Sequence, residues 1–120
     1  MKPITQTLFA MLMLCLGTLT TSGSSAQEAV PAIEIHAHRY AFVPSEITLT
    51  TGKPVKLVII SDDVPHSLLV EGLKINKEAT KGHPAEITIT PNSAGDFRGE
   101  CGRFCGSGHG SMLFMIHVKD

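Results

Sequence analysis

The chain has 120 residues, of which 42% are hydrophobic and 18% are charged, and its formal net charge is −1. This length and apolar content suit one small domain with a modest core. Because no run or face of Lys and Arg appears, we expect no nucleic-acid partner.

The N-terminal segment, residues 1–26, is typical of a secretory signal peptide. Lys2 supplies a positive start, residues 8–16 form an unbroken apolar run, and the segment ends in small residues. That run is too short to cross a bilayer, which takes about 20 apolar residues. We therefore expect a periplasmic or secreted protein, with no stable membrane insertion after cleavage. Residues 27–31 then form a short linker, and residues 32–120 form the single mature domain.

The mature chain is predicted to be all-β. Short segments rich in β-branched residues alternate with Gly, Pro, Asn and Asp, and no window keeps a 3.6-residue apolar period. The apolar run Val58-Ile59-Ile60 predicts a strand that is covered on both faces. Strands of this length and spacing indicate a Greek-key β-sandwich or barrel. The predicted strands are residues 33–38, 46–50, 54–61, 67–70, 85–90 and 113–118.

The most specific chemistry lies near the C-terminus, between a strand-like segment and the last predicted strand. The run C-G-R-F-C-G-S-G-H-G-S-M offers Cys101, Cys105, His109 and Met112 as ligands. Soft sulfur ligands with imidazole favour copper over magnesium, calcium or manganese, and a weak axial thioether is typical of electron-transfer copper. Cys15 lies inside the signal segment, so the mature chain keeps only the two cysteines of this run.

One more strong ligand must come from elsewhere, and His66 is the candidate. It follows the predicted strand 54–61, where a ligand at a strand end can meet a loop far along the chain. Asp63 and Ser67 flank it and are candidates for hydrogen bonds to the loop. The loop region is rich in Gly, which adopts positive φ at little cost and so suits a tight fold around a metal. These glycines are at positions 99, 102, 106, 108 and 110.

The pair His66-Ser67 and the spacing C-x3-C-x3-H-x2-M together resemble the binuclear copper centre (CuA) of cytochrome c oxidase subunit II, which nitrous oxide reductase shares. The resemblance extends from the F-x-P-x-x-I segment at Phe42 to the end of the chain. It implies a cupredoxin-like fold and two copper ions, with both thiolates bridging the pair and one imidazole on each copper. The ligands it implies are His66, Cys101, Cys105, His109, Met112 and the backbone carbonyl of Arg103.

Arg103 departs from the family pattern, which usually has Glu at this position. A carbonyl ligand does not depend on its side chain, so we expect copper binding to survive. The contact that the Glu makes towards the catalytic subunit of the oxidase is not expected here. The chain also has no Trp. It therefore lacks the aromatic residues through which family members receive electrons.

Three other uses of these residues stay open at this point. The two cysteines of an exported protein could form a disulfide. A structural zinc ion could take both cysteines with His66 and His109, which leaves Met112 without a role. A mononuclear blue-copper site could use His66, Cys105, His109 and Met112, which leaves Cys101 unused.

The expected function is single-electron transfer by an exported carrier. Cytochrome c or another small redox donor would supply electrons, and a terminal oxidase would receive them. The alternative is a periplasmic protein that stores copper or delivers it for oxidase assembly. No catalytic motif is present, so we expect no independent catalysis. Three apolar side chains, Leu68, Phe97 and Phe104, are expected to form a dry shell around the metal, while His36 and His38 are expected on a solvated strand face.

Overall fold

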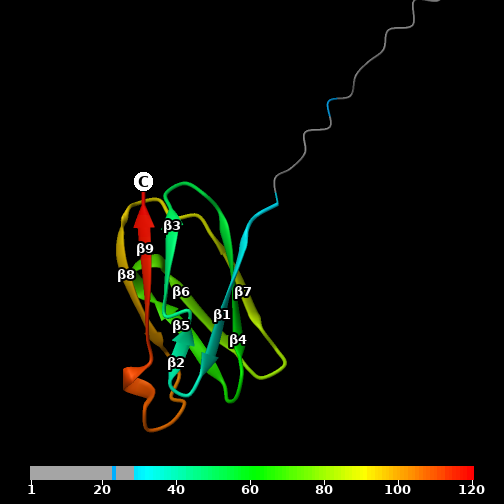
Figure 1. Cartoon of the computed structure of the whole chain (residues 1–120), viewed down its shortest axis with the longest axis vertical. Coiled ribbons are helices and arrows are strands. Elements are labelled where there is room, and N and C mark those ends of the chain that lie inside the picture. The colour runs from blue at the N-terminus through cyan, green and yellow to red at the C-terminus, as the bar shows by residue number, and fades with distance from the viewer. Residues whose placement is uncertain (1–22, 24–28) are drawn as a thin grey trace, which may run out of the picture.

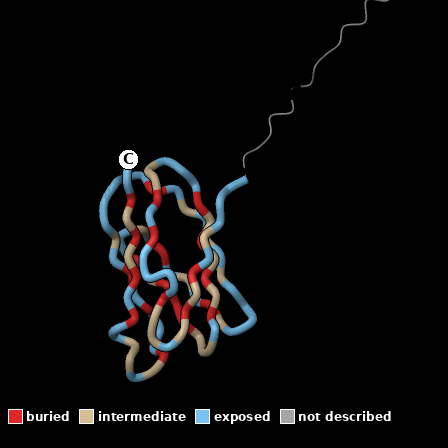
Figure 2. Tube along the Cα trace, viewed as in Figure 1, coloured by how far each residue is buried: buried red, intermediate tan, exposed pale blue. Residues whose placement is uncertain are grey.

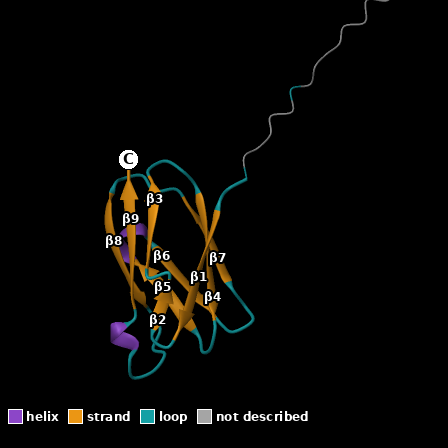
Figure 3. Ribbon diagram, in the orientation of Figure 1, coloured by secondary structure: helices purple, strands orange, loops and turns teal. Residues whose placement is uncertain are grey.

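The computed structural model describes residue 23 and residues 29–120, so the predicted signal segment lies outside the described residues apart from Gly23. The described part contains nine β-strands and two short 3-10 turns (Figures 1 and 3). The strands are β1 (Ala32–His38), β2 (Ala41–Val43), β3 (Glu46–Thr50), β4 (Val55–Ser61), β5 (His66–Val70), β6 (Ile75–Ala79), β7 (Ala85–Ile89), β8 (Gly95–Cys101) and β9 (Leu113–Lys119). The 3-10 turns are η1 (Glu71–Leu73) and η2 (His109–Ser111).

The strands form two sheets that pack face to face. One sheet has the order β2-β1-β4-β7, and the other has the order β3-β9-β8-β5-β6. The pairs β1–β4 and β3–β9 are parallel, while the remaining pairs are antiparallel. Because strands adjacent in a sheet are often distant in sequence, the chain crosses repeatedly between the two layers, as Greek-key sandwiches do. The prediction of an all-β sandwich is confirmed.

Three strands, β2, β6 and β8, are absent from the predicted list because their patterns are weak. β8 reads G-D-F-R-G-E-C, with two glycines and three charged residues, and the sequence indicated it only as a strand-like segment before Cys101. β2 has only three residues, with Phe42 as its single buried side chain. β6 reads I-N-K-E-A and buries only its ends, Ile75 and Ala79, so it lacks the alternation of a half-buried strand. Its pairing with β5 at the edge of the sheet, rather than its composition, makes it a strand.

The core lies between the sheets, and buried residues, red in Figure 2, alternate with more exposed ones along strands such as β3 and β4. Phe42 of β2 and Phe114 of β9 pack edge to face in its middle, with ring centroids 5.7 Å apart. This geometry is favoured by the opposite charge on the edge and the face of aromatic rings. The pair connects the two sheets directly, since β2 and β9 belong to different sheets.

The sequence-based interpretation of β4 needs correction. In this strand every second residue is buried, including Leu57 and Ile59, whereas Val58 and Ile60 are only half-buried. The apolar run therefore has one face in the core, and its other face belongs to the outer surface of the four-stranded sheet. A continuous apolar run is ambiguous in this respect, because periodicity alone does not say what covers the second face.

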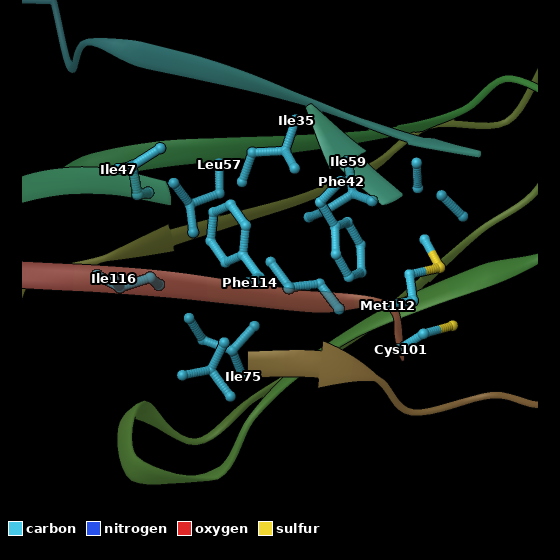
Figure 4. Close-up of a cluster of buried hydrophobic side chains, with 14 of the residues drawn as sticks. Ile35, Phe42, Ile47, Leu57, Ile59, Ile75, Cys101, Met112, Phe114 and Ile116 are labelled. Atoms are coloured by element: carbon cyan, nitrogen blue, oxygen red, sulfur yellow. The ribbon is translucent and has the colours of Figure 1, made fainter. Parts of the chain in front are cut away.

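The loops that carry the candidate ligands gather at one end of the sandwich. In Figure 1 the loop between β8 and β9 lies at the opposite end from the C-terminus, beside the β1–β2 connection. Cys101 and Met112 lie together at that end of the core, beyond the ring of Phe42 (Figure 4). Among the described residues, no helix is long and apolar enough to cross a membrane.

Candidate metal centre

Two neighbouring strands bring the distant ligands together. His66 is the first residue of β5 and Cys101 is the last residue of β8, and these strands pair antiparallel with Leu68 opposite Cys101. Cys105 follows in the loop, and the 3-10 turn η2 begins at His109 and is followed directly by Met112. The sheet therefore positions one imidazole and one thiol, and the loop between β8 and β9 positions the rest.

The two cysteine sulfurs form the middle of the site. Their Sγ atoms are 3.8 Å apart, and both residues are free thiols. A disulfide bond would bring the sulfurs to about 2.05 Å. Both side chains are buried, so the sulfurs are held near each other in a place largely closed to water.

Each sulfur lies beside its own imidazole. The Nδ1 atom of His66 is 3.9 Å from the Sγ atom of Cys101, and the Nδ1 atom of His109 is 3.8 Å from the Sγ atom of Cys105. His66, Cys101 and Cys105 have ligand atoms that all lie within 4.8 Å of one another. The site thus consists of two similar halves that meet at the sulfur pair.

Each half also has one weak donor. The backbone carbonyl oxygen of Arg103 is 3.1 Å from the Sγ atom of Cys101, and the Sδ atom of Met112 is 3.9 Å from the Sγ atom of Cys105. Met112 is fully buried. The structure therefore brings all six of the ligand groups expected from the sequence to one place.

Asp63 orients His66. Its Oδ1 atom accepts a hydrogen bond from Nε2 of His66 at 2.6 Å, which leaves the Nδ1 lone pair of that ring directed at Cys101. Partial burial on its own would raise the pKa of Asp63. Hydrogen bonds from the backbone N–H of Arg39, from His66 and from the backbone N–H of Val64 outweigh burial and lower this pKa from 3.8 to about 2. The carboxylate is therefore charged at neutral pH and holds the imidazole in one tautomer.

Arg39, which the sequence analysis did not single out, joins the two halves of the site. Its backbone N–H donates to Oδ2 of Asp63 at 2.8 Å, and its side-chain Nε donates to the carbonyl oxygen of Cys105 at 3.0 Å. One residue of the β1–β2 connection thus links the partner of His66 with the loop that carries Cys105. No spacing rule in the sequence reveals this link, because Arg39 is more than sixty residues away from Cys105.

The ligand loop is closed by hydrogen bonds and by a close contact with Tyr40. The N–H of Cys101 donates to the carbonyl of Met112 at 3.1 Å, so the two ends of the loop meet. Gly106 has a φ of 138°, and a Cβ atom there would lie 2.4 Å from Oη of Tyr40. At Gly108 a Cβ atom would lie 2.4 Å from Cδ2 of the same ring. Close approach of Tyr40 therefore explains the glycines at positions 106 and 108, and Gly106 also has a positive φ.

The expected dry shell is only partly correct. Leu68 is fully buried beneath the site, and Phe97 is half-buried against the core. Phe104 is 76% exposed, and its ring lies against the ring of His109 with centroids 5.7 Å apart. Phe104 thus faces solvent rather than shielding the metal site from beneath.

The chemistry of the donors fits a soft metal. Burial and the neighbouring Cys101 raise the pKa of the Cys105 thiol from 9.0 to about 11, so this thiol is protonated in the metal-free protein and must release a proton when a metal binds. Two thiolates, two imidazoles and a thioether suit copper, whereas magnesium, calcium and manganese prefer oxygen donors. Such a set at one end of a Greek-key β-sandwich defines the class of small copper-binding β proteins.

The comparisons with known proteins agree with this class. The family model for the cupredoxin-like domain matches residues 8–113, and the chain belongs to this family. Cytochrome c oxidase subunit 2 of Thermus thermophilus is 32% identical over 88 residues, which cover 73% of this chain and 65% of that protein. The periplasmic domain of subunit II of the Bradyrhizobium japonicum cytochrome oxidase shares the fold, with a TM-score of 0.70 at 17% identity over 78% of this chain and 87% of that one.

The relatives are mostly longer than this chain. The probable cytochrome c oxidase subunit 2 of Streptomyces avermitilis is 39% identical over 70 residues, which cover 58% of this chain but only 22% of that protein. The match therefore covers only about a fifth of the length of that relative. Relationship to subunit II implies copper binding here, while the activities of the whole oxidase do not follow from it.

Proposed function

We propose that the chain is a copper-binding electron-transfer domain with a binuclear, CuA-type centre. The observation that carries this proposal is the pairing within the site: two sulfurs 3.8 Å apart, each beside one Nδ1 atom and one weak donor. His66, Cys101, Cys105 and His109 act as the strong ligands, and Met112 and the carbonyl of Arg103 act as the weak ones. Two copper ions bound there would accept and return one electron.

The pairing also argues against the two other metal sites. A mononuclear blue-copper site leaves Cys101 unused, yet Cys101 is buried and lies against both His66 and Cys105. A zinc site leaves Met112 unused, yet its sulfur lies against Cys105. A binuclear site gives each of these buried sulfurs a ligand role.

The residues around the metal hold it rather than react with it. Strand β5 fixes His66 and strand β8 fixes Cys101. Asp63 and Arg39 connect His66 with the loop at Cys105 through hydrogen bonds. A site held by rigid elements changes little when an electron is gained or lost, which favours fast transfer. We propose an exported, periplasmic or secreted domain, since the related subunit II domain of Bradyrhizobium japonicum is described as periplasmic.

Two cysteine variants test the binuclear assignment. Both Cys101→Ser and Cys105→Ser should lose the paired centre, because each removes a sulfur that both halves share. Cys101→Ser should keep one copper, since His66, Cys105, His109 and Met112 remain, and its copper content and absorption spectrum report this. If Cys101→Ser kept the copper stoichiometry and spectrum of the unaltered protein, the bridging role would be wrong.

Electron transfer itself is tested against copper delivery. The copper-loaded protein should exchange electrons with a soluble cytochrome c in stopped-flow experiments and should keep its copper when mixed with a copper-free oxidase. Rapid handover of copper to that oxidase, without electron exchange, would replace the carrier function with the delivery function.

A further inference from the structure

A groove opens at the surface directly above Cys105. Its volume is about 340 Å³, and we name it the arginine groove after the two charged residues that line it, Arg39 and Arg103. The remaining lining residues are Val64, Pro65, Phe104, Cys105 and Gly106. The lining thus joins two guanidinium groups with an apolar floor, and it contains no carboxylate.

The carboxylates near this groove are already engaged. Asp63 accepts hydrogen bonds from His66 and from two backbone N–H groups, so it is held inside the site. Glu78 of β6 pairs with Arg103, and the two side chains are 43% and 49% exposed. An exposed ion pair of this kind contributes little to stability. Arg103 can therefore exchange Glu78 for a carboxylate of a partner at little cost.

Phe104 adds an apolar contact in the same place. It is 76% exposed and stands between Arg103 and Cys105 in the chain, and its ring lies against His109. An exposed aromatic ring with basic neighbours matches the usual anatomy of an interface, which has an apolar centre and a polar rim. A partner seated on Phe104 would contact a residue that directly precedes Cys105 and whose ring lies against that of His109.

We propose that the arginine groove and Phe104 form the docking surface for a redox partner with an acidic face. The partner would present carboxylates to Arg39 and Arg103 and an apolar cofactor edge to Phe104. This inference rests on the proposed electron-transfer function and names the partner class for it. The transfer is one electron from the reduced haem iron of the partner to the oxidised copper centre, with no bond made or broken.

The test compares two c-type cytochromes, one with a ring of carboxylates at its haem edge and one with a ring of lysines. Binding is measured by NMR titration, and electron transfer is measured by stopped flow, across a range of ionic strength. The acidic cytochrome should bind more tightly and react faster, and both effects should weaken with salt. Arg103→Glu should slow its association about tenfold, a typical size for electrostatic steering.

The control variants distinguish the effect of a charge change at the groove from the effect of the same change in net charge elsewhere. Lys119→Glu makes the same change in charge at the end of β9 far from the site (Figure 1) and should leave the rate nearly unchanged. Arg103→Gln avoids a new repulsion with Glu78 and should show a smaller loss in the same direction. The copper content of each variant is measured as well, and rates are compared between samples of equal copper content.

The outcomes distinguish this proposal from the proposed function. Tighter binding of the lysine-rich cytochrome, equal losses for Arg103→Glu and Lys119→Glu, or no binding of the acidic cytochrome would overturn the docking surface. A complex with the acidic cytochrome that depends on Arg103 but passes no electron would support the surface and overturn the electron-transfer function.

Discussion

Single residues at the site have unequal roles, and Met112 and His66 show this most clearly. Both are fully buried. His66 ties the site to β5 and is held by Asp63, whereas Met112 contributes one weak donor beside Cys105. Removing His66 should therefore affect mainly copper affinity, whereas removing Met112 should affect mainly the reduction potential.

Met112→Leu should keep both coppers and raise the reduction potential. Leucine is similar in size, so the core stays packed, while the weak donor is lost and the surroundings become less polar. His66→Ala should lower copper affinity by more than about 100-fold, beyond the loss seen when only an outer hydrogen-bond partner is removed. Copper competition titrations and voltammetry measure both effects. Equal copper loss in the two variants would show that the ranking of ligands is wrong.

At this scale, the residues that gather at the site could be predicted because most of them lie in one short run with a specific spacing, with His66 beside a predicted strand. Arg39 and Tyr40 could not be predicted, since their roles come from contacts across the fold. Phe104 was expected to form part of a dry shell around the metal, yet the loop directs it to solvent.

The element that shapes the site is the loop between β8 and β9, which packs on the ring of Tyr40. The tightest approaches are at Gly106 and Gly108, where a Cβ atom would lie 2.4 Å from an atom of that ring. At Gly110 no atom lies within 4 Å of the position that a Cβ atom would take. The chain therefore provides a matched pair of glycines in the same loop.

Gly108→Ala should lower the free energy of unfolding by about 1–3 kcal/mol, a typical cost of overpacking. Gly110→Ala should change it by less than about 0.5 kcal/mol, as most open surface substitutions do. Urea unfolding of the two variants measures the difference, and adding Tyr40→Ala to Gly108→Ala should remove part of the loss. Similar losses for Gly108→Ala and Gly110→Ala would refute the role given to Tyr40.

Strands could be predicted where apolar and polar residues alternate in the sequence. They could not be predicted where only pairing with a neighbouring strand makes the segment a strand. β3 alternates buried Ile47 and Leu49 with more exposed residues, as its sequence indicates. In β6 three polar residues lie between two buried ones, so only its pairing with β5 identifies it. The register that puts His66 near Cys101 also depends on such pairing, because β5 and β8 are distant in the chain.

Across the whole molecule, one surface group links three strands away from the metal. Nδ1 of His117 on β9 bonds to Asp96 of β8 at 2.6 Å, and its Nε2 bonds to Glu46 of β3 at 3.2 Å. The hydrogen bond to Asp96 has the largest effect and the hydrogen bond to Glu46 the next largest, and both raise the pKa of His117 above 6.5. When it is protonated, this imidazole donates to both carboxylates and so links β9 to β8 and to β3.

The stability from His117 should depend on pH. Because the folded protein has the higher pKa, the contribution is fully present below about pH 6.5, the unfolded value. It should be lost as the pH rises through the raised pKa. The difference in free energy of unfolding between the unaltered protein and His117→Gln should thus shrink above this pH, measured on the metal-free protein. A difference for His117→Gln that stays constant across this pH range would contradict the prediction.

The central claim is that both halves of the site share one electron through two copper ions. The most direct measurement is the copper content of the fully loaded protein together with its EPR spectrum. Two coppers per chain with a seven-line hyperfine pattern are expected, because the unpaired electron couples equally to two copper nuclei. One copper per chain with a four-line pattern would contradict the binuclear centre.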